Sequence, residues 1–185
     1  MMEIYFIFVI FTTLFSFLFA RNFIRHGYYN KLLSKNNYSI FYFVGLLTLF
    51  PKINFFNLHL TRRFIETIIF RYNKSRMSIF QFLFGISYYF FLSLHLRDKN
   101  IKISFYYILL NIIQFCAHYQ IFYKKNHKLR YTHYICEFLI YLHIYNMLKT
   151  NILKYNLFYL ALFIFVTVYD RERMSFRNIF RKKKI

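Results

Sequence analysis

The sequence has few cysteines and few acidic residues. Cys116 and Cys136 both lie inside apolar segments and lack Cys-x-x-Cys spacing, so we expect neither a disulfide framework nor a zinc or other metal site. Six acidic residues stand against 26 Lys and Arg, which gives a formal charge of +20. Such a charge attracts phosphates. The basic residues nevertheless cluster between apolar runs rather than on one solvated face, and we therefore expect no nucleic-acid partner.

The residues that are abundant are apolar and aromatic. Of 185 residues, 58% are hydrophobic and 25% are aromatic, which is too apolar for an ordinary soluble domain of this length. Seven apolar segments approach membrane-span length, and they are Ile4–Ala20, Tyr38–Phe50, Asn54–Phe70, Met77–Leu96, Ile101–Tyr123, Tyr131–Leu148 and Leu153–Tyr169. The sequence predicts an all-α polytopic membrane protein, a single domain of about seven transmembrane helices, or six if the short second segment is not a span.

The charges between the segments predict an orientation. No basic residue precedes the first segment, which favours a signal anchor with its N-terminus outside over a cleaved signal peptide. The gaps then assigned to the cytosol hold Arg21, Arg25, Lys31, Lys35, Arg71, Lys74, Arg76, Lys124, Lys125, Lys128 and Arg130. The opposite gaps hold only Lys52, Arg97, Lys99 and Lys149. The positive-inside rule therefore favours seven spans and a cytosolic C-terminus.

The C-terminal tail, residues 170–185, is strongly basic. Its last residues, Lys182-Lys183-Lys184-Ile185, are typical of the dilysine address of endoplasmic-reticulum membrane proteins. A basic tail that contacts anionic headgroups is the alternative. Two glycosylation sequons, beginning at Asn37 and Asn73, fall on the cytosolic side in this topology and should stay unmodified.

Three of the apolar segments each carry one stripe of polar residues at helical spacing. The stripes are His59, Arg63 and Glu66 in the third segment, Asn111, Gln114, His118 and Lys125 in the fifth, and His133, Glu137 and Tyr141 in the sixth. Ionisable groups are costly inside a bilayer and mark functional sites there. We expect the stripes to converge on a polar cavity open to the cytosol, where a large anionic cofactor can enter.

The same residues also have purely structural interpretations. Arg63 and Glu66 form an i, i+3 pair that can serve only to make the helix insertable. His118 with Gln114 can serve only as an interhelical hydrogen-bonding pair.

Single basic residues near span ends usually reach out to the headgroups. We assign Arg62 to this behaviour, and Lys125 has the same alternative to a role in the stripe. His95 and His143 each stand alone near a span end, and we expect a structural role for both.

Three patches, in this order along the chain, resemble the steroid 5α-reductase family and in particular its polyprenol-reductase branch. The first is HLTRRFIETIIFRYNKSRM, with the pattern H-x-x-R-R-x-x-E at His59, Arg62, Arg63 and Glu66, followed by a span with Gly85 and Tyr88-Tyr89. The second is QFCAHYQIFYKK, similar to the family's Gln-x-x-x-His segment. The third is THYICEFLIYL, with His133, Glu137 and Tyr141 in register with a Pro-His-Tyr-x-x-Glu-x-x-Ile-Tyr run.

The resemblance implies a seven-helix enzyme of the endoplasmic-reticulum membrane. Such an enzyme uses NADPH to reduce a C=C bond conjugated to a carbonyl, in this branch the α-isoprene unit of polyprenol or polyprenal during dolichol synthesis for protein N-glycosylation. Its partners would be the polyprenoid lipid and membrane lipids, with no obligatory protein partner. The cofactor contacts that the resemblance carries over are Gln114, His118, Lys125, His133, Glu137 and Tyr169.

The chain also departs from the family pattern. The loop that helps to cover the cofactor is reduced to about Asn126–Arg130, and Thr132 replaces the proline before the His-Tyr pair. Leu60 replaces the tyrosine found in steroid-reducing members, which argues against a steroid substrate. The chain is shorter than typical members.

Hydride addition to an alkene needs an electron sink, which an unsaturated aldehyde has and an allylic alcohol lacks. We therefore expect a polyprenal-type enal to be the species reduced. A donor on the His59/Glu66 face would polarise its carbonyl oxygen, and Arg63 would hold or orient Glu66. The alternatives are a very-long-chain enoyl reductase of the same family and a non-catalytic membrane interaction protein.

Overall fold

The computed structural model describes residues 2–19, 33–34, 37–52, 54–70, 76–126, 129 and 131–182, with side chains in all of these except 34, 76, 171 and 173–182. Several basic residues on which the orientation depends lie outside the described residues. They are Arg21, Arg25, Lys31, Lys35, Arg71, Lys74, Lys128 and Arg130. The sequon at Asn73 and the end of the dilysine address, residues 183–185, lie outside them as well.

Each of the seven apolar segments forms a helix. The α-helices are α1 (Met2–Phe19), α3 (Tyr38–Leu49), α4 (Phe55–Ile69), α5 (Ile79–Leu96), α6 (Phe105–His118), α7 (Thr132–Leu148) and α8 (Asn151–Lys182). A π-helical turn, η2 (Tyr119–Tyr123), continues α6, and β1 (Leu33–Ser34) pairs with β2 (Arg76–Met77) in the described part of the chain. The expected all-α class is confirmed, with this two-residue ladder as an addition.

Polar side chains fix where three of these helices begin. The Asn54 side chain accepts a hydrogen bond from Phe56 N at 3.0 Å before α4, and the Ser104 hydroxyl accepts one from Tyr107 N at 3.1 Å before α6. Ser78 and Gln81 form a reciprocal capping box at the start of α5. These caps satisfy N–H groups that a helix N-terminus leaves free, and in α6 the cap moves the start from the expected Ile101 to Phe105.

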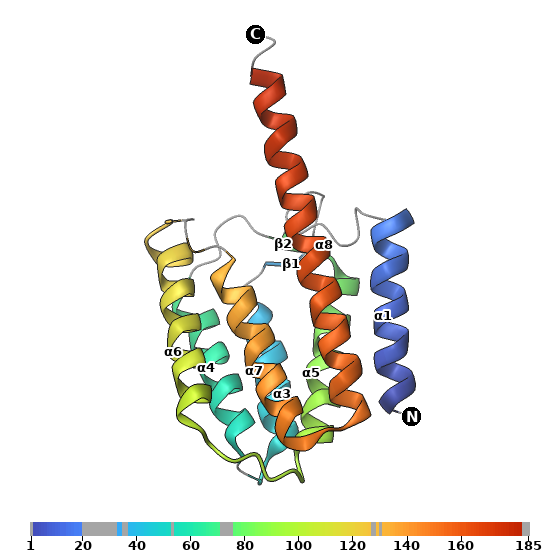
Figure 1. Ribbon diagram of the computed structural model, residues 1–185, viewed down its shortest axis with the longest axis vertical. Helices are drawn as coiled ribbons and strands as arrows, with labels where there is room; N and C mark the ends of the chain where they lie inside the picture. The colour runs from blue at the N-terminus through green and yellow to red at the C-terminus, as the bar shows by residue number, and fades with distance from the viewer. Residues whose placement is uncertain are drawn as a thin grey trace.

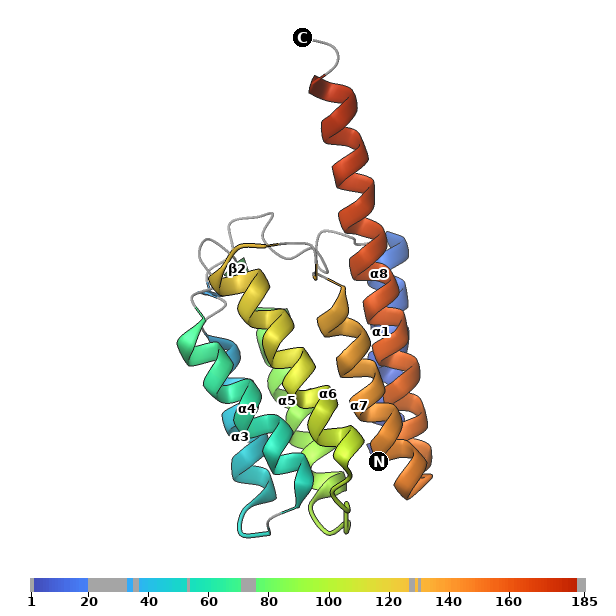
Figure 2. The same ribbon diagram turned by 60° about the vertical axis from the view of Figure 1, so that its left-hand side comes forward.

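Successive helices run in alternating directions along the bundle (Figures 1 and 2). At one end, β1 and β2 join the connection before α3 to the connection before α5 as an antiparallel pair. At the other end, Lys52 Nζ lies 2.5 Å from Asp98 Oδ1, and Asn54 Nδ2 donates to Leu96 O at 2.8 Å. Connections expected on the same side of the membrane therefore contact one another.

Glycine allows α3 and α5 to approach closely. A Cβ atom at Gly85 of α5 would lie 2.5 Å from two ring atoms of Phe41, and one at Gly45 of α3 would lie 3.0 Å from Ser93 Oγ of α5. Small residues at helix interfaces permit this kind of packing within apolar surroundings. The two helices thereby form one side of the bundle, against which α4 packs.

The first and last helices lie together at one edge of the bundle. Phe17 of α1 packs against Phe165 and Tyr169 of α8, with ring centroids 6.2 and 5.8 Å apart. The Tyr5 hydroxyl of α1 is hydrogen-bonded to Ser87 of α5 at 2.7 Å. The sequence predicted that the last apolar segment ends at Tyr169 and that a basic tail follows. Helix α8 instead continues through the first part of this tail to Lys182 (Figure 1).

Within the described residues, three helices are long and apolar enough to cross a membrane, namely Met2–Phe19, Ile79–Leu96 and the Asn151–Asp170 part of α8. Many large apolar side chains of the described surface are exposed, including Ile4, Phe11 and Phe80 at 65–70%. This pattern is typical of a protein associated with a membrane. The shorter apolar helix α3 has 12 residues. Seven spans stay a prediction.

Candidate functional site

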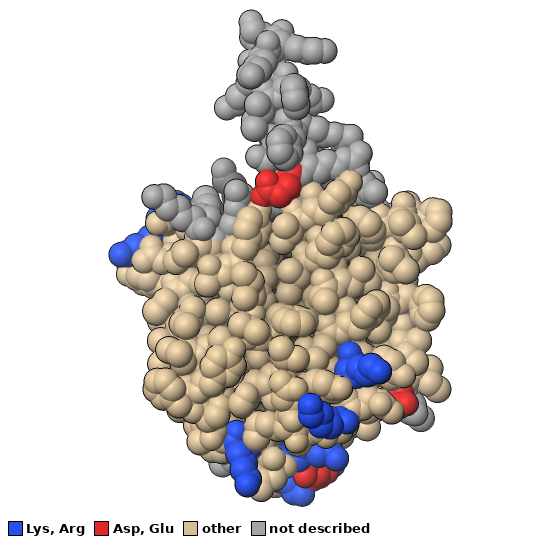
Figure 3. Space-filling model, in the orientation of Figure 1, with Lys and Arg blue, Asp and Glu red and all other residues tan. Residues whose placement is uncertain are grey.

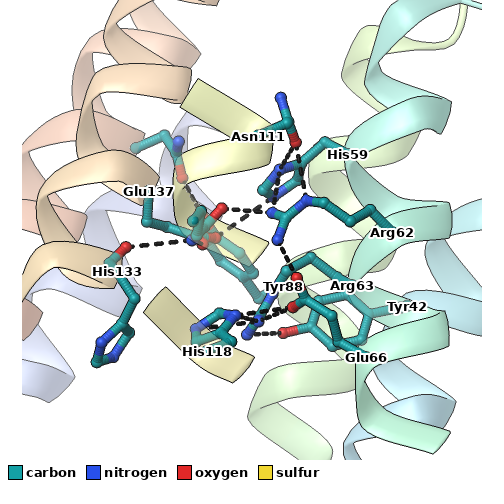
Figure 4. A network of polar contacts seen from close by, with 12 residues as sticks. Tyr42, His59, Arg62, Arg63, Glu66, Tyr88, Asn111, His118, His133 and Glu137 are labelled. Carbon is teal, nitrogen blue, oxygen red and sulfur yellow. Dashed lines mark hydrogen bonds and ion pairs between the residues drawn. The ribbon is translucent and has the colours of Figure 1, made fainter. Parts of the chain in front are cut away.

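A buried network of polar side chains lies where α4, α6 and α7 meet (Figure 4). Helix α4 supplies its central members, because His59, Arg62, Arg63 and Glu66 recur at the spacing of one helical face. The side chains of His59 and Glu66 are fully buried, and those of Arg62 and Arg63 are only 12% and 14% exposed. The polar stripes of the three helices therefore converge, as the sequence predicted.

Glu66 is the acceptor for one half of the network. Arg63 Nη1 donates to Glu66 Oε2 at 2.6 Å, Arg62 Nη1 donates to Oε1, and His118 Nδ1 of α6 lies 2.8 Å from Oε2. The same Nδ1 lies 2.8 Å from Arg63 Nη1, so this ring nitrogen faces both a carboxylate acceptor and a guanidinium donor. The other arm of Arg63 donates to the Tyr42 hydroxyl of α3 at 2.8 Å. This half thus ties α4 to both α6 and α3.

Arg62 links α4 to α6 at two further points. Its Nε donates to Asn111 Oδ1 at 3.0 Å, and its Nη2 donates to Gln114 Oε1. We had assigned Arg62 to the headgroups, and this interpretation is wrong. The side chain points inward because Glu66, Asn111 and Gln114 together offer acceptors for most of the guanidinium N–H groups, which water would otherwise have to satisfy.

Gln114, Glu137 and His59 form the other half. Gln114 Nε2 donates to Glu137 Oε2 of α7 and lies 3.1 Å from the backbone oxygen of His133. His59 Nε2 lies 3.4 Å from Glu137 Oε1, at an ion-pair distance but outside hydrogen-bond geometry. Arg62 Nη2 lies 3.2 Å from His59 Nδ1 and can only donate. Asn111 Oδ1 lies 3.2 Å from the same Nδ1, so this ring nitrogen faces both a donor and an acceptor.

The charges of the network balance. Two arginines face two glutamates, and with neutral histidines the formal charge of this group is zero. In an apolar bundle such pairs hold together because a single unpaired charge would be strongly unfavourable. The Nη atoms of both arginines and Nε of Arg62 already bond to protein oxygens. An oxygen ligand must therefore share or replace one of these acceptors, and it would then meet preorganised donors.

The remaining residues assigned from the resemblance lie at different places. The His133 ring packs on the His118 ring with centroids 5.0 Å apart, so it adjoins the network. Lys125 is exposed and has a φ of 54° after the π-helical turn, which takes it off the face of Gln114 and His118. Tyr169 is 43% exposed and packs on Phe17 of α1, away from the network.

Sequence reasoning missed three members of this region. The i, i+4 spacing of Arg62 and Glu66 is a signal that could have placed Arg62, and Asn111 belonged to the predicted stripe without being assigned to the site. Tyr42 lies on α3 and has no periodic polar neighbour that would single it out. Its position depends on how α3 packs against α4.

Other polar side chains form hydrogen bonds between helix ends or between neighbouring helices. Tyr88 of α5 donates to Asn156 Oδ1 of α8 at 2.6 Å, next to the network (Figure 4). His95 lies 3.0 Å from the Thr150 hydroxyl and His143 lies 3.1 Å from the Ser104 hydroxyl, in keeping with the structural roles expected for both histidines. Among the described residues, no group of His, Cys, Asp and Glu could hold a metal ion.

Comparison of the chain with known proteins found no matching family model, no matching curated protein and no matching solved structure.

Proposed function

We propose that the protein is an NADPH-dependent reductase of a conjugated C=C bond in a polyprenoid lipid, embedded in the endoplasmic-reticulum membrane. The observation that carries the proposal is the meeting of the His59–Glu66 face of α4 with Gln114 and His118 of α6 and Glu137 of α7. These residues belong to the three patches that resemble the polyprenol-reductase branch. Patches far apart in sequence but joined in one buried site support a shared chemical role.

A topology of seven spans with a cytosolic C-terminus is supported by the directions of the helices. Alternate helices run in opposite directions (Figure 1), and each end of the bundle collects connections that the charge pattern assigns to one side. The end that holds β1 and β2 would face the cytosol. The end with Lys52 and Asp98 would face the lumen.

The residues on the cytosolic side of the network carry the functional groups that a nicotinamide dinucleotide would need as partners. The Gln114 amide and the Glu137 carboxylate can recognise a carboxamide, and the exposed Lys124 and Lys125 can meet phosphates. His133, beside His118, would complete this set. NADPH, when bound, would supply the hydride. Tyr169 does not belong to the set, because it packs against α1.

The substrate end of the proposal concerns the carbonyl oxygen. In the reduction of an enal, hydride adds to the β-carbon and the C=C π electrons move toward the carbonyl, so negative charge develops on that oxygen until a proton from water adds to the α-carbon. Arg62 and Arg63 are donors held in place by Glu66, and as fixed donors they would stabilise this charge. Glu66 would act as their positioning residue.

A second candidate is a non-catalytic membrane interaction protein. The observation that favours it is that the network satisfies itself, since Arg62, Arg63 and Glu66 are all paired within the protein. Such a network can serve only to fix helix packing. Binding and oxidation of NADPH by the purified protein distinguish the two candidates.

The test is NADPH oxidation by purified, detergent-solubilised protein with a short polyprenal, the matching polyprenol and a medium-chain enoyl thioester. The proposal expects oxidation with the polyprenal and its loss in Glu66→Gln. The exposed acid Asp98 provides the matched control, and Asp98→Asn should keep wild-type rates. Oxidation with the thioester alone would point to the enoyl-reductase alternative. No oxidation and no NADPH binding would overturn the proposal in favour of the second candidate.

A further inference from the structure

A groove runs along the edge of the bundle between α1, α7 and α8, away from the buried network. Its volume is about 550 Å³, within the ~300–1,000 Å³ of pockets that hold small molecules. The residues that line it are Ile7, Ile10, Phe11, Phe138, Tyr145, Lys154, Tyr155, Leu157, Phe158 and Ala161. Apart from Lys154, none of them is charged.

The groove faces the apolar surroundings of the bundle. Its walls α1 and α8 are two of the three helices that are long and apolar enough to cross a membrane. Phe11 and Phe158 are 65% and 61% exposed. In a bilayer the neighbours available to such side chains are lipid chains, and an unfilled apolar groove would lose dispersion contacts. A lipid chain therefore suits the walls.

One end of the groove is cationic. Lys154 lies in the first turn of α8, and it takes part in no ion pair within the described part of the chain. Beside it, Lys149 holds its ammonium 5.4 Å from the centroid of the Tyr145 ring, which also lines the groove. Figure 3 shows Lys and Arg side chains, with a few Asp and Glu among them, toward the lower part of the view and an almost uncharged surface above them.

The spacing of charge and apolar wall matches a membrane lipid. Ala161 lies seven residues after Lys154, so the groove reaches roughly 10 Å along α8 at 1.5 Å per residue. A headgroup at Lys154 would thus leave its chain beside Ala161 and Phe11. Lysine at the membrane surface attracts anionic headgroups. We propose that the groove between α1, α7 and α8 binds an anionic phospholipid, with its phosphate at Lys154 and one chain along the apolar walls.

A second groove provides an internal control. It lies between α3 and α5 and is lined by Leu47, Phe90, Leu94 and Arg97 among others. Its cation lies next to an acid that it shares with Lys52, since Arg97 Nε is 3.8 Å from Asp98 Oδ2 and Lys52 Nζ is 2.5 Å from Asp98 Oδ1. Among the described residues no acid pairs with Lys154, so Lys154 should select for lipid charge more strongly than Arg97 does.

The test is native mass spectrometry of the purified full chain titrated with phosphatidylglycerol or phosphatidylcholine of identical chains. The wild-type protein should bind the first phosphatidylglycerol about fivefold more tightly than phosphatidylcholine, the size of effect expected for one lysine near a headgroup. Lys154→Gln should abolish this preference and Lys154→Arg should keep it. Ala161→Phe, which fills the groove, should weaken binding of both lipids.

Arg97→Gln is the matched control and should leave the preference unchanged. Equal binding of the two lipids by the wild-type protein, or an unchanged preference in Lys154→Gln, would overturn the anionic site. Unchanged lipid binding by Ala161→Phe would contradict the proposal that the acyl chain lies in this groove. These outcomes are independent of NADPH oxidation, because no residue that lines the groove belongs to the network of α4, α6 and α7.

Discussion

His118 of α6 is bonded to Glu66 of α4, with Nδ1 2.8 Å from Oε2 and both side chains buried. The contact joins two helices whose sequences are separated by a whole span and two connections. Arg63 Nη1 lies 2.8 Å from the same His118 Nδ1, so the histidine meets both members of the Arg63–Glu66 ion pair. A buried acid and a buried base in contact form the centre of the proposed site.

The first prediction concerns Arg62. Arg62→Met keeps most of the volume but removes the donors to Glu66, Asn111 and Gln114. Because one partner of a buried ionic network is lost, the free energy of unfolding should fall by about 3–5 kcal/mol. Denaturation of the solubilised protein with increasing dodecyl sulfate measures this. Arg97→Met, at the end of α5, is the control and should cost far less. Equal losses in both variants would contradict the inward role of Arg62.

The second prediction concerns the coupling of Glu66 and His118. In a double-mutant cycle of Glu66→Gln and His118→Ala, the unfolding free energies should not add, and the coupling should be about 0.5–3 kcal/mol. A cycle of Glu66→Gln with Arg97→Gln should be additive, because these residues share no partner. Additivity in the first cycle would show that the bond between α4 and α6 contributes nothing.

The third prediction concerns the packing of α3 on α5. Gly85→Ala places a Cβ within 2.5 Å of the Phe41 ring, and the neighbouring helix must move to accept it. Overpacking of this kind should lower the unfolding free energy by about 1–3 kcal/mol. Phe41→Leu, which removes the ring atoms in question, should recover part of the loss when combined with Gly85→Ala. The absence of any rescue would argue against this contact.

The fourth prediction concerns pH at the end of the bundle opposite β1 and β2. The hydrogen bond from the Lys52 ammonium holds the pKa of Asp98 below its usual value. Because the carboxyl pKa is depressed, the Lys52–Asp98 pair stabilises the folded state at neutral pH, and this stabilisation is lost as pH falls through that pKa. Lys52→Gln should therefore raise the pKa of Asp98, as followed by carbon NMR of its carboxyl group. Lys102→Gln, a change of another exposed lysine near this end, should shift it much less, and equal shifts would contradict the pairing.

Much of the fold follows from the sequence because each helix is marked by its own residues. Apolar runs bounded by Asn54, Ser78 and Ser104 predict α4, α5 and α6 to within a few residues. The convergence of the stripes was also predictable, since ionisable groups such as His59, Glu66 and Glu137 on apolar helices usually face the interior of the bundle. The end of α8 was not predictable from the sequence, because the basic residues after Tyr169 do not interrupt helical geometry.

The details of the site depend on packing that periodicity does not contain. Arg62 and Arg63 are adjacent in sequence, yet Arg62 turns inward to Asn111 and Gln114 of α6. Arg63 turns inward to Glu66 of its own helix and to Tyr42 of α3. Tyr42 contacts Arg63 because α3 packs on α4. Lys125 left the predicted stripe because a π-helical turn and a left-handed residue end the helix. The stripe would have continued through Lys125 only in a regular α-helix.

The central claim is that this network carries NADPH-dependent reduction of a lipid enal. The most direct measurement follows deuterium from NADPH, labelled at the position of the transferred hydride, into a short polyprenal incubated with the purified protein. The proposal predicts a saturated product with one deuterium on the β-carbon, formed by the wild-type protein and by Asp98→Asn but not by Glu66→Gln. A lipid without deuterium, together with no NADPH binding, would contradict it.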